Sequence, residues 1–273
     1  MYTRTLQRNL SILIIFNYIC PNNWKQFTIY LTMKKIFLYT AAISLLAFSC
    51  NRDKDDNTVT EQISIQERNQ LDNEAMTHFL ETRYMDDNGV IKMFKDNDPS
   101  DDHFTKLADL NPKQLSNGTY YILRPNAQPN NGTPIHSDSV IRLMGRAVSY
   151  KSNKTEKGGR FGEDIIFQSG LESGEIEVDP KYFFAPKSFI DQYNTTKGKS
   201  YDKSFFEIEG FSEALQHFQA FNKSDDEFPQ LQGVIIVPSR AAFARDAHYP
   251  YTTYNMYDRS VVFNFQVYKS QAR

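Results

Sequence analysis

Apolar side chains recur at helical spacing from residue 65 onward. Leu71, Ala75 and Phe79 lie four positions apart, so they fall on one face of an α-helix. The run stops at residues 86–89, Asp-Asp-Asn-Gly, which are turn-forming residues. The pattern therefore predicts a helix of about five turns, which is the main element of a helical N-terminal segment at 65–112.

After Pro112 the spacing changes to the period of two that is typical of strands. One helix is predicted here, at 211–221, because its apolar residues lie on one side. We interpret 151–160 as a charged loop and 180–200 as a polar insertion. Predicted strands fall at 119–123, 139–150, 165–167, 205–210, 234–237 and 260–268. This order of elements predicts an α+β fold, in which a curved antiparallel sheet wraps around one central helix.

The front of the chain holds two apolar stretches. The first, at 10–20, is shorter than the roughly 20 residues that a membrane-spanning helix needs. The second follows the basic tripeptide MKK at 33–35 and has the basic, apolar and small-residue order of a secretory signal peptide. We therefore expect translation to start at Met33, which makes residues 1–32 an upstream extension and residues 33–49 the signal.

This signal ends in LAFSC at 46–50, which resembles a bacterial lipobox. In a lipobox the cysteine thioether receives a diacylglycerol and the cysteine becomes the mature N-terminus. A cleaved signal with an incidental cysteine is the alternative. Residues 50–64 are interpreted as a polar tether, and KDD at 54–56 resembles the surface-export signal of Bacteroidota lipoproteins. We expect a membrane anchor through lipidated Cys50, in the bacterial envelope and at its outer membrane.

Composition narrows the possible chemistry. The only cysteines are Cys20 and Cys50, so processing at Cys50 would leave no thiol for a disulfide, a metal or catalysis. The net charge is -2 and no long basic run occurs, which argues against a nucleic-acid partner. Ser239 lacks the glycines of a hydrolase elbow, no phosphate-binding glycine loop is present, and the histidines have no ligand spacing. We therefore expect no cofactor and no metal.

Three strings in the second half resemble the FKBP-type peptidyl-prolyl isomerases. They are FEIEGFSEAL at 206–215, VPSRAAFA at 237–244 and VVFNFQV at 261–267. The segment GTYY and the segment VIRLMG, which lie earlier in the chain, also resemble the opening strands of the family. The resemblance implies an FKBP-like domain at 113–273, with insertions at 151–200 and 244–259.

The resemblance also implies a small hydrophobic pocket that receives proline. Phe243 would face the proline ring and Phe211 would form the floor of the pocket. Ile208 would be a wall that offers backbone polar groups to the peptide, and Phe263 would be the wall from the last strand. Simple core packing of these apolar residues is the alternative interpretation.

The chain departs from the family pattern at several of these positions. Phe243 and Leu143 stand where the family commonly has tyrosine, and Ala244 replaces a glycine. At the rim, Phe161 with Glu163 or the acid after it is the nearest counterpart of an aromatic-acid pair. One lost hydrogen bond is worth about 0.5 to 1.5 kcal/mol, or about tenfold in rate, so we expect the activity to be weakened.

Isomerising an X-Pro bond needs no nucleophile, acid or metal, because a dry aromatic pocket can favour the twisted amide over the planar one. The sequence therefore predicts an envelope isomerase that acts on proline-containing segments of exported proteins. The alternatives are a non-catalytic binding module on the same fold, accessory to a surface or secretion machine, and a purely structural lipoprotein. Insertions that cover the pocket would favour the module, and an open cleft between Phe211, Phe243 and Phe263 would favour the isomerase.

Overall fold

Helix α3 forms where the apolar spacing predicts it. In the computed structural model, which describes residues 63–273, α3 spans Ile65–Thr82 and buries the apolar face named above. Ser64 caps its start by accepting a hydrogen bond from the backbone N–H of Glu67 (3.0 Å). The upstream extension, the signal, Cys50 and nearly all of the tether lie outside the described residues, so those predictions stay predictions.

A short hairpin follows the helix. Strands β1 (Arg83–Met85) and β2 (Ile91–Met93) pair antiparallel, and the turn between them is held by the carboxylate of Asp86, which accepts from the backbone N–H groups of Asn88 and Val90. The helix therefore ends at Thr82, and the acidic turn predicted to stop it closes the hairpin instead. A 3-10 turn, η1 (Leu107–Asp109), completes this part of the chain.

The main sheet has seven strands, and all of its pairs are antiparallel. Along one path the order is β3 (Lys113–Gln114), β4 (Tyr120–Leu123), β10 (Gly233–Val237), β11 (Arg259–Gln271), β6 (Val140–Thr155) and β7 (Gly158–Ser169). Strand β8 (Glu177–Val178) pairs with β6, and β5 (Thr133–Pro134) pairs with β9 (Gln219–Ala220) in a separate ladder. The α+β class is confirmed.

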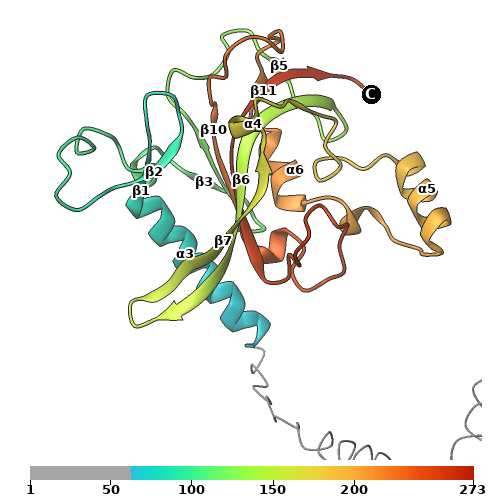
Figure 1. Cartoon of the computed structure of the whole chain (residues 1–273), viewed down its shortest axis with the longest axis horizontal. Coiled ribbons are helices and arrows are strands. Elements are labelled where there is room, and N and C mark those ends of the chain that lie inside the picture. Colours follow the sequence, from blue (N-terminus) through green and yellow to red (C-terminus); the bar gives the residue numbers. More distant parts are fainter. Residues whose placement is uncertain (1–62) are drawn as a thin grey trace, which may run out of the picture. The chain divides into compact units, whose positions relative to one another are not determined.

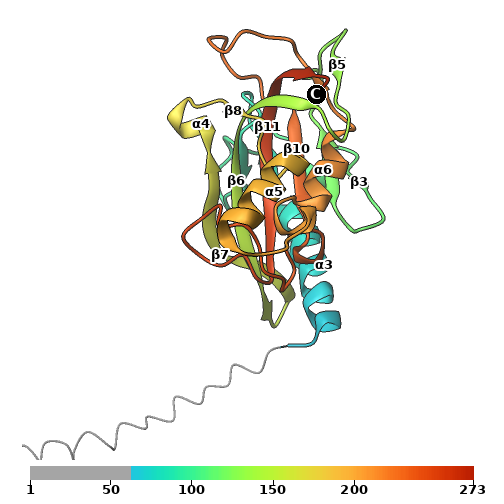
Figure 2. The same ribbon diagram turned by 90° about the vertical axis from the view of Figure 1, so that its right-hand side faces the viewer.

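Each face of this sheet carries its own hydrophobic layer. Figure 1 shows α3 and α6 on opposite sides of the sheet, and Figure 2 views the sheet from the α6 side. Side chains of a strand alternate between faces. In β10, Val234 and Ile236 pack with α3, whereas Ile235 and Val237 pack on the opposite side with α6 (Glu209–Leu215). The central strands are therefore covered on both faces, and residues 63–273 form one compact unit that includes α3.

The predicted loop at 151–160 is instead the tip of a long hairpin. Strand β6 continues to Thr155 and β7 begins at Gly158, where the hydroxyl of Thr155 donates to the carbonyl of Gly158 (2.6 Å). The sequence pattern predicted a loop here because most of the charged residues at 151–160 face the solvent, which leaves no apolar alternation to indicate strands. A Cβ at Gly159 would lie 3.0 Å from the Cα of Leu71, so glycine lets α3 approach β7 closely.

The predicted strand at 205–210 is not a strand. The chain forms a 3-10 turn, η2 (Lys203–Phe205), and α6 already starts at Glu209. The predicted helix at 211–221 also ends early, at Leu215, because the chain continues into β9. Phe205 and Phe206 are adjacent and both buried, an arrangement that a half-buried strand does not allow, and tertiary packing has overridden the strand pattern.

The polar insertion at 180–200 contains more structure than predicted. Its second half is helix α5 (Lys187–Lys197), which has no buried residue and stands away from the sheet in Figure 1. Its first half sends Tyr182 and Phe183 into the core, where their side chains are 2% and 0% exposed. The remaining short elements are α4 (Gly170–Ser173) and η3 (Ser239–Ala241). Among the described residues, no helix combines the length and the apolar character of a membrane span.

One buried carboxylate ties α3 to the rest of the unit. Asp72 accepts from the backbone N–H (3.0 Å) and the hydroxyl (2.6 Å) of Ser239, and from the hydroxyl of Ser152 (2.6 Å). Burial raises the pKa of Asp72, although these hydrogen bonds and nearby Arg68 act in the opposite direction. Asp72 thus links the helix to both β6 and the turn that leads to Phe243.

We expect Asp72→Ala to lower the free energy of unfolding by about 2 to 4 kcal/mol, because three buried donors would lose their acceptor. Urea denaturation monitored by circular dichroism measures this change. Glu81→Ala, on the exposed side of the same helix, is the matched control and should change stability by less than about 0.5 kcal/mol. Equal midpoints for the two variants would contradict the linking role.

Candidate functional site: a closed aromatic cluster

The floor of the predicted pocket is set by a close approach between α6 and β10. A Cβ at Gly210 would lie 2.7 Å from Cγ1 of Val237 and 3.1 Å from Cβ of Ala241, so only glycine fits at this point. The next residue, Phe211, is therefore pressed onto the inner face of the sheet. Its ring stacks on Phe263 with centroids 4.2 Å apart. The structure thus brings together two of the predicted pocket residues.

Phe243 reaches the same region from the turn after β10. It follows η3, and Ala244 adopts a positive φ of 48°, a backbone conformation that favours glycine. Phe243 is 3% exposed, and its ring contacts His248 at 4.8 Å and Tyr251 at 6.3 Å between centroids. Phe243 therefore belongs to the same core cluster as Phe211 and Phe263, with Tyr251 beside it.

Two tyrosines from the insertions fill the space that a proline ring would need. The ring of Tyr182 lies 5.5 Å from Phe211 and 6.0 Å from Phe263, measured between centroids. Tyr251 lies 5.8 Å from Tyr182, and its hydroxyl donates to the carbonyl of Phe206 (2.8 Å). As a result Phe211 and Phe263 are only 0% and 1% exposed. The aromatic site is closed in this structure.

The backbone at Ile208 is also occupied. Ile208 is fully buried, and its N–H donates to the carbonyl of Tyr182 (2.8 Å). This N–H is the backbone donor that the resemblance assigns to a bound peptide. Tyr182 therefore takes both the aromatic surface and the hydrogen bond that a substrate would use.

The two predicted rim residues do not form a rim. Leu143 is 0% exposed and packs inside the core cluster around Phe211. Phe161 lies on the opposite face of the sheet, where its ring contacts Phe79 (5.8 Å) and Tyr150 (4.9 Å). The placement of Phe161 at the rim is therefore corrected by the structure.

Sequence reasoning missed Phe167, the β7 aromatic that lies on the same face of the sheet as Phe211 and Phe263. Its ring contacts Tyr182 (5.3 Å) and Phe263 (6.0 Å), and an amide, Gln168, follows it where the family pattern has an acid. The register between β6 and β7 shifts between Gly162 and Ile165 and again between Ile166 and Gln168, and such bulges change which face a residue occupies. The Ile-Ile-Phe run before Gln168 indicates a strand, but it does not reveal the bulges that decide which face Phe167 occupies.

The polar groups of the cluster hold it closed. The hydroxyl of Tyr182 donates to the carboxylate of Glu177 (2.7 Å), which lies on β8. Burial raises the pKa of Glu177, and burial together with this neighbouring carboxylate raises the pKa of Tyr182 well above its ordinary value. Burial likewise raises the pKa of Tyr251. Both tyrosines therefore remain protonated donors. Within residues 63–273, no group of acidic, histidine or cysteine side chains could hold a metal ion.

An open hollow of about 620 Å³ lies beside the closed cluster. One edge of Phe243 and the partly buried Phe184 contribute its apolar surface, and Glu207, Glu213 and Arg240 contribute much of its polar surface. Phe211, Ile208 and Phe263 do not line it. The hollow is therefore lined by both polar and apolar groups, and of the predicted proline-binding residues Phe243 alone reaches it.

Comparisons with known proteins give only weak likenesses. No family model matches the chain, and no curated protein matches it. Among solved structures, FkpA from Escherichia coli is 13% identical with a TM-score of 0.31, and the match covers 59% of this chain and 52% of FkpA. A peptidyl-prolyl cis-trans isomerase from Pseudomonas syringae is 14% identical with a TM-score of 0.31, and the match covers 59% of this chain and 80% of that one. This chain thus spans about half the length of FkpA, and neither likeness supports a conclusion about its activity.

We expect Glu177→Gln to become more stable relative to the unsubstituted protein as pH rises. The folded-state pKa of Glu177 lies above the ordinary 4.5, so its contribution to stability is complete below that value and is lost as pH rises through the folded-state pKa. The amide of glutamine keeps an acceptor for Tyr182 and does not ionise. Denaturation midpoints at pH of about 4 and about 8 measure the effect.

The control for this titration is Glu156→Gln. Glu156 is exposed at the tip of the β6–β7 hairpin, at the other end of β6 from the β8 pairing, so its substitution should change stability by less than about 0.5 kcal/mol at either pH. A pH-independent difference for Glu177→Gln would contradict the proposed burial of its charge.

Proposed function

We propose that this chain is an envelope lipoprotein whose FKBP-like domain serves as a binding module and has no isomerase activity in its closed form. The FKBP-like part of the proposal is supported by the positions of the three sequence strings. Phe211 opens the helix on the inner face of an antiparallel sheet, Phe243 follows the turn after β10, and Phe263 lies on β11 beneath the helix. That is the arrangement which the resemblance implies.

The single observation that carries the proposal is the position of Tyr182. A substrate proline would need the surface of Phe211 and the N–H of Ile208, and Tyr182 occupies both. Catalysis requires tighter binding of the twisted amide than of the planar one, and aromatic surface that Tyr182 already covers binds neither form of the peptide. The insertions thus cover the pocket, which is the outcome that favours a module over an isomerase.

The surface offered to a partner then comes from the insertions. Helix α5 has no buried residue and projects from the sheet in Figure 1. Its own Phe189 and Tyr193 pack on Phe206 and Tyr249, which holds the helix in place. Its other side, which includes Lys187, Asp191 and Thr195, is exposed and offers a surface to another molecule. We infer that it contacts an exported protein or a subunit of an envelope machine.

An isomerase with a movable cover is the second candidate. Tyr251 is only partly buried, and it lies in a segment, 244–258, without helix or strand apart from turns. The aromatic floor beneath it is intact. Displacement of Tyr251 and Tyr182 would uncover Phe211 and Phe263. Because these two rings are in place, a latent isomerase activity is the second candidate.

Cis/trans exchange of an X-Pro peptide, measured by NMR, separates these two functions. The soluble chain from Asn51 onward keeps the whole compact unit Ile63–Arg273. We expect this protein to leave the exchange rate unchanged, and the double variant Tyr182→Ala with Tyr251→Ala to raise it, because the cover is removed. Acceleration by the unsubstituted protein that is lost in a folded Phe211→Ala variant would establish the isomerase instead.

The lipid anchor is tested separately. We expect the full chain, expressed in a bacterium that processes lipoproteins, to incorporate labelled palmitate and to sediment with membranes. Cys50→Ser should abolish both, and Cys20→Ser should change neither if Met33 is the start. Incorporation of label into Cys50→Ser would contradict the anchor at this residue.

A further inference from the structure

A second cavity lies on the face of the sheet opposite the aromatic cluster. Its volume is about 360 Å³, and it is bounded by the end of α3, the β1–β2 hairpin and strands β6, β7 and β11. Phe79, Val148 and Val262 form its apolar floor and are at most 8% exposed. Tyr150, Asn264 and five charged side chains also line it, and cavities of this size are typical of small-molecule sites.

Arg83 lines this cavity without a carboxylate partner. Its guanidinium lies 4.9 Å from the centroid of Phe79, and Nη1 donates to the hydroxyl of Thr82 (2.9 Å). Within residues 63–273, no acidic side chain lies within salt-bridge distance of it. Arg83 is partly buried, and burial lowers its pKa, although nearby Tyr150 acts in the opposite direction. A partly buried cation in this state gains from an anionic ligand.

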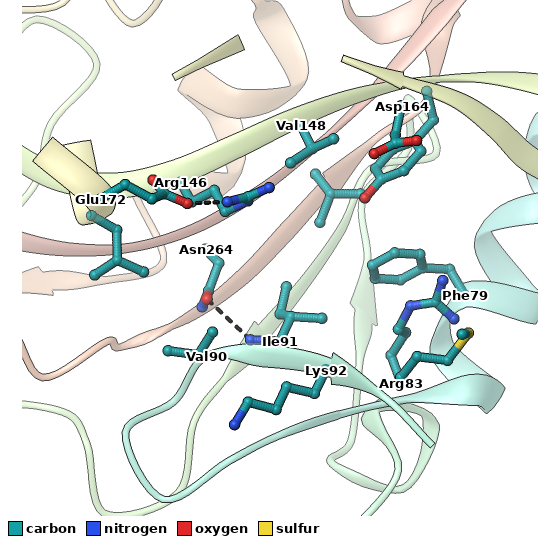
Figure 3. A pocket seen from close by; sticks show the side chains of 14 residues that line it. Phe79, Arg83, Val90, Ile91, Lys92, Arg146, Val148, Asp164, Glu172 and Asn264 are labelled. Atoms are coloured by element: carbon teal, nitrogen blue, oxygen red, sulfur yellow. Dashed lines mark hydrogen bonds and ion pairs between the residues drawn. The ribbon is translucent and has the colours of Figure 1, made fainter. Parts of the chain in front are cut away.

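The other basic groups of the cavity are already paired. Lys92 forms a salt bridge with Asp86 (2.8 Å). Arg146 forms a salt bridge with Glu172, which Figure 3 shows. Asp164 also lines the cavity, but it is exposed and lies beyond salt-bridge distance of Arg83. Arg83 is therefore the basic group of this cavity that remains available to a ligand.

The positive charge at this end of the cavity is reinforced by α3 and β7. Burial lowers the pKa of His78, and Arg160 and Arg83 lower it further. These two arginines therefore lie close enough to His78 to act on its charge. A single carboxylate placed on Arg83 would meet a favourable potential there.

We propose that this cavity binds an aliphatic carboxylate of medium chain length. The carboxylate bonds Arg83, and the chain lies over Phe79, Val148 and Val262. At about 30 Å³ for each non-hydrogen atom, the cavity holds about a dozen such atoms, which matches a fatty acid of octanoate size. The site is independent of the proposed proline-binding cluster, because it lies on the other face of the sheet and shares no lining residue with it.

Methyl NMR spectra of the soluble chain from Asn51 onward, titrated with octanoate and with octanol, test this site. We expect saturable shifts of the Val148 and Val262 methyl signals with octanoate. Arg83→Met should weaken octanoate binding at least about tenfold, because a charge-assisted hydrogen bond is lost, and should leave octanol binding unchanged. Arg83→Lys should restore part of the octanoate affinity.

Arg142→Met is the matched control. Arg142 lies on the same strand as Arg146, pairs with Asp225 and does not line the cavity, so its substitution should leave octanoate binding unchanged. The denaturation midpoint of each variant establishes that it is folded. Absence of saturable shifts in the unsubstituted protein, or equal octanoate affinity of a folded Arg83→Met variant, would overturn the proposal.

Discussion

The structure depends on the double-sided burial of two central strands. In β10 and β11, nearly every side chain is removed from water on one face or the other. A sheet of this kind is stable only when both faces are covered, because each exposed apolar side chain costs about 1.5 to 3 kcal/mol of lost burial. Helix α3 covers one face, and helix α6 with the first half of the 180–200 insertion covers the other. The N-terminal helix is therefore a structural layer of the same unit.

The same requirement explains the closed aromatic site. An open proline pocket leaves aromatic surface exposed to water until a substrate arrives. Here the insertions supply Tyr182 and Tyr251, which cover that surface and satisfy their hydroxyls on Glu177 and on the carbonyl of Phe206. This packing stabilises the inner layer, and it leaves Phe211 and Phe263 without accessible surface in this structure.

Buried charge is placed differently on the two faces. On the inner face, a carboxylate at Glu177 receives a tyrosine hydroxyl, and its raised pKa reports incomplete compensation of the burial. Asp72, on α3, accepts from three donors of two elements, and burial still raises its pKa. On the outer face, Arg83 is partly buried with no acidic partner among the described residues. The molecule therefore buries an aromatic cluster on its inner face and leaves a partly buried cation without an acidic partner on its outer face.

The sequence by itself determined the elements whose pattern is local. Helix α3 and strands β10 and β11 were predicted from their apolar patterns, because neighbouring residues decide them. A helix that contains Phe211 was also predicted, although α6 starts earlier, at Glu209, and ends earlier, at Leu215. Only the tertiary structure decided the site. The faces that Phe161 and Phe167 occupy depend on bulges in the pairing of β6 with β7. Tyr182 is held at the core by a hydrogen bond that its carbonyl accepts from the N–H of Ile208. Such contacts leave no periodic trace in the sequence, since they join segments whose separation the local pattern does not encode.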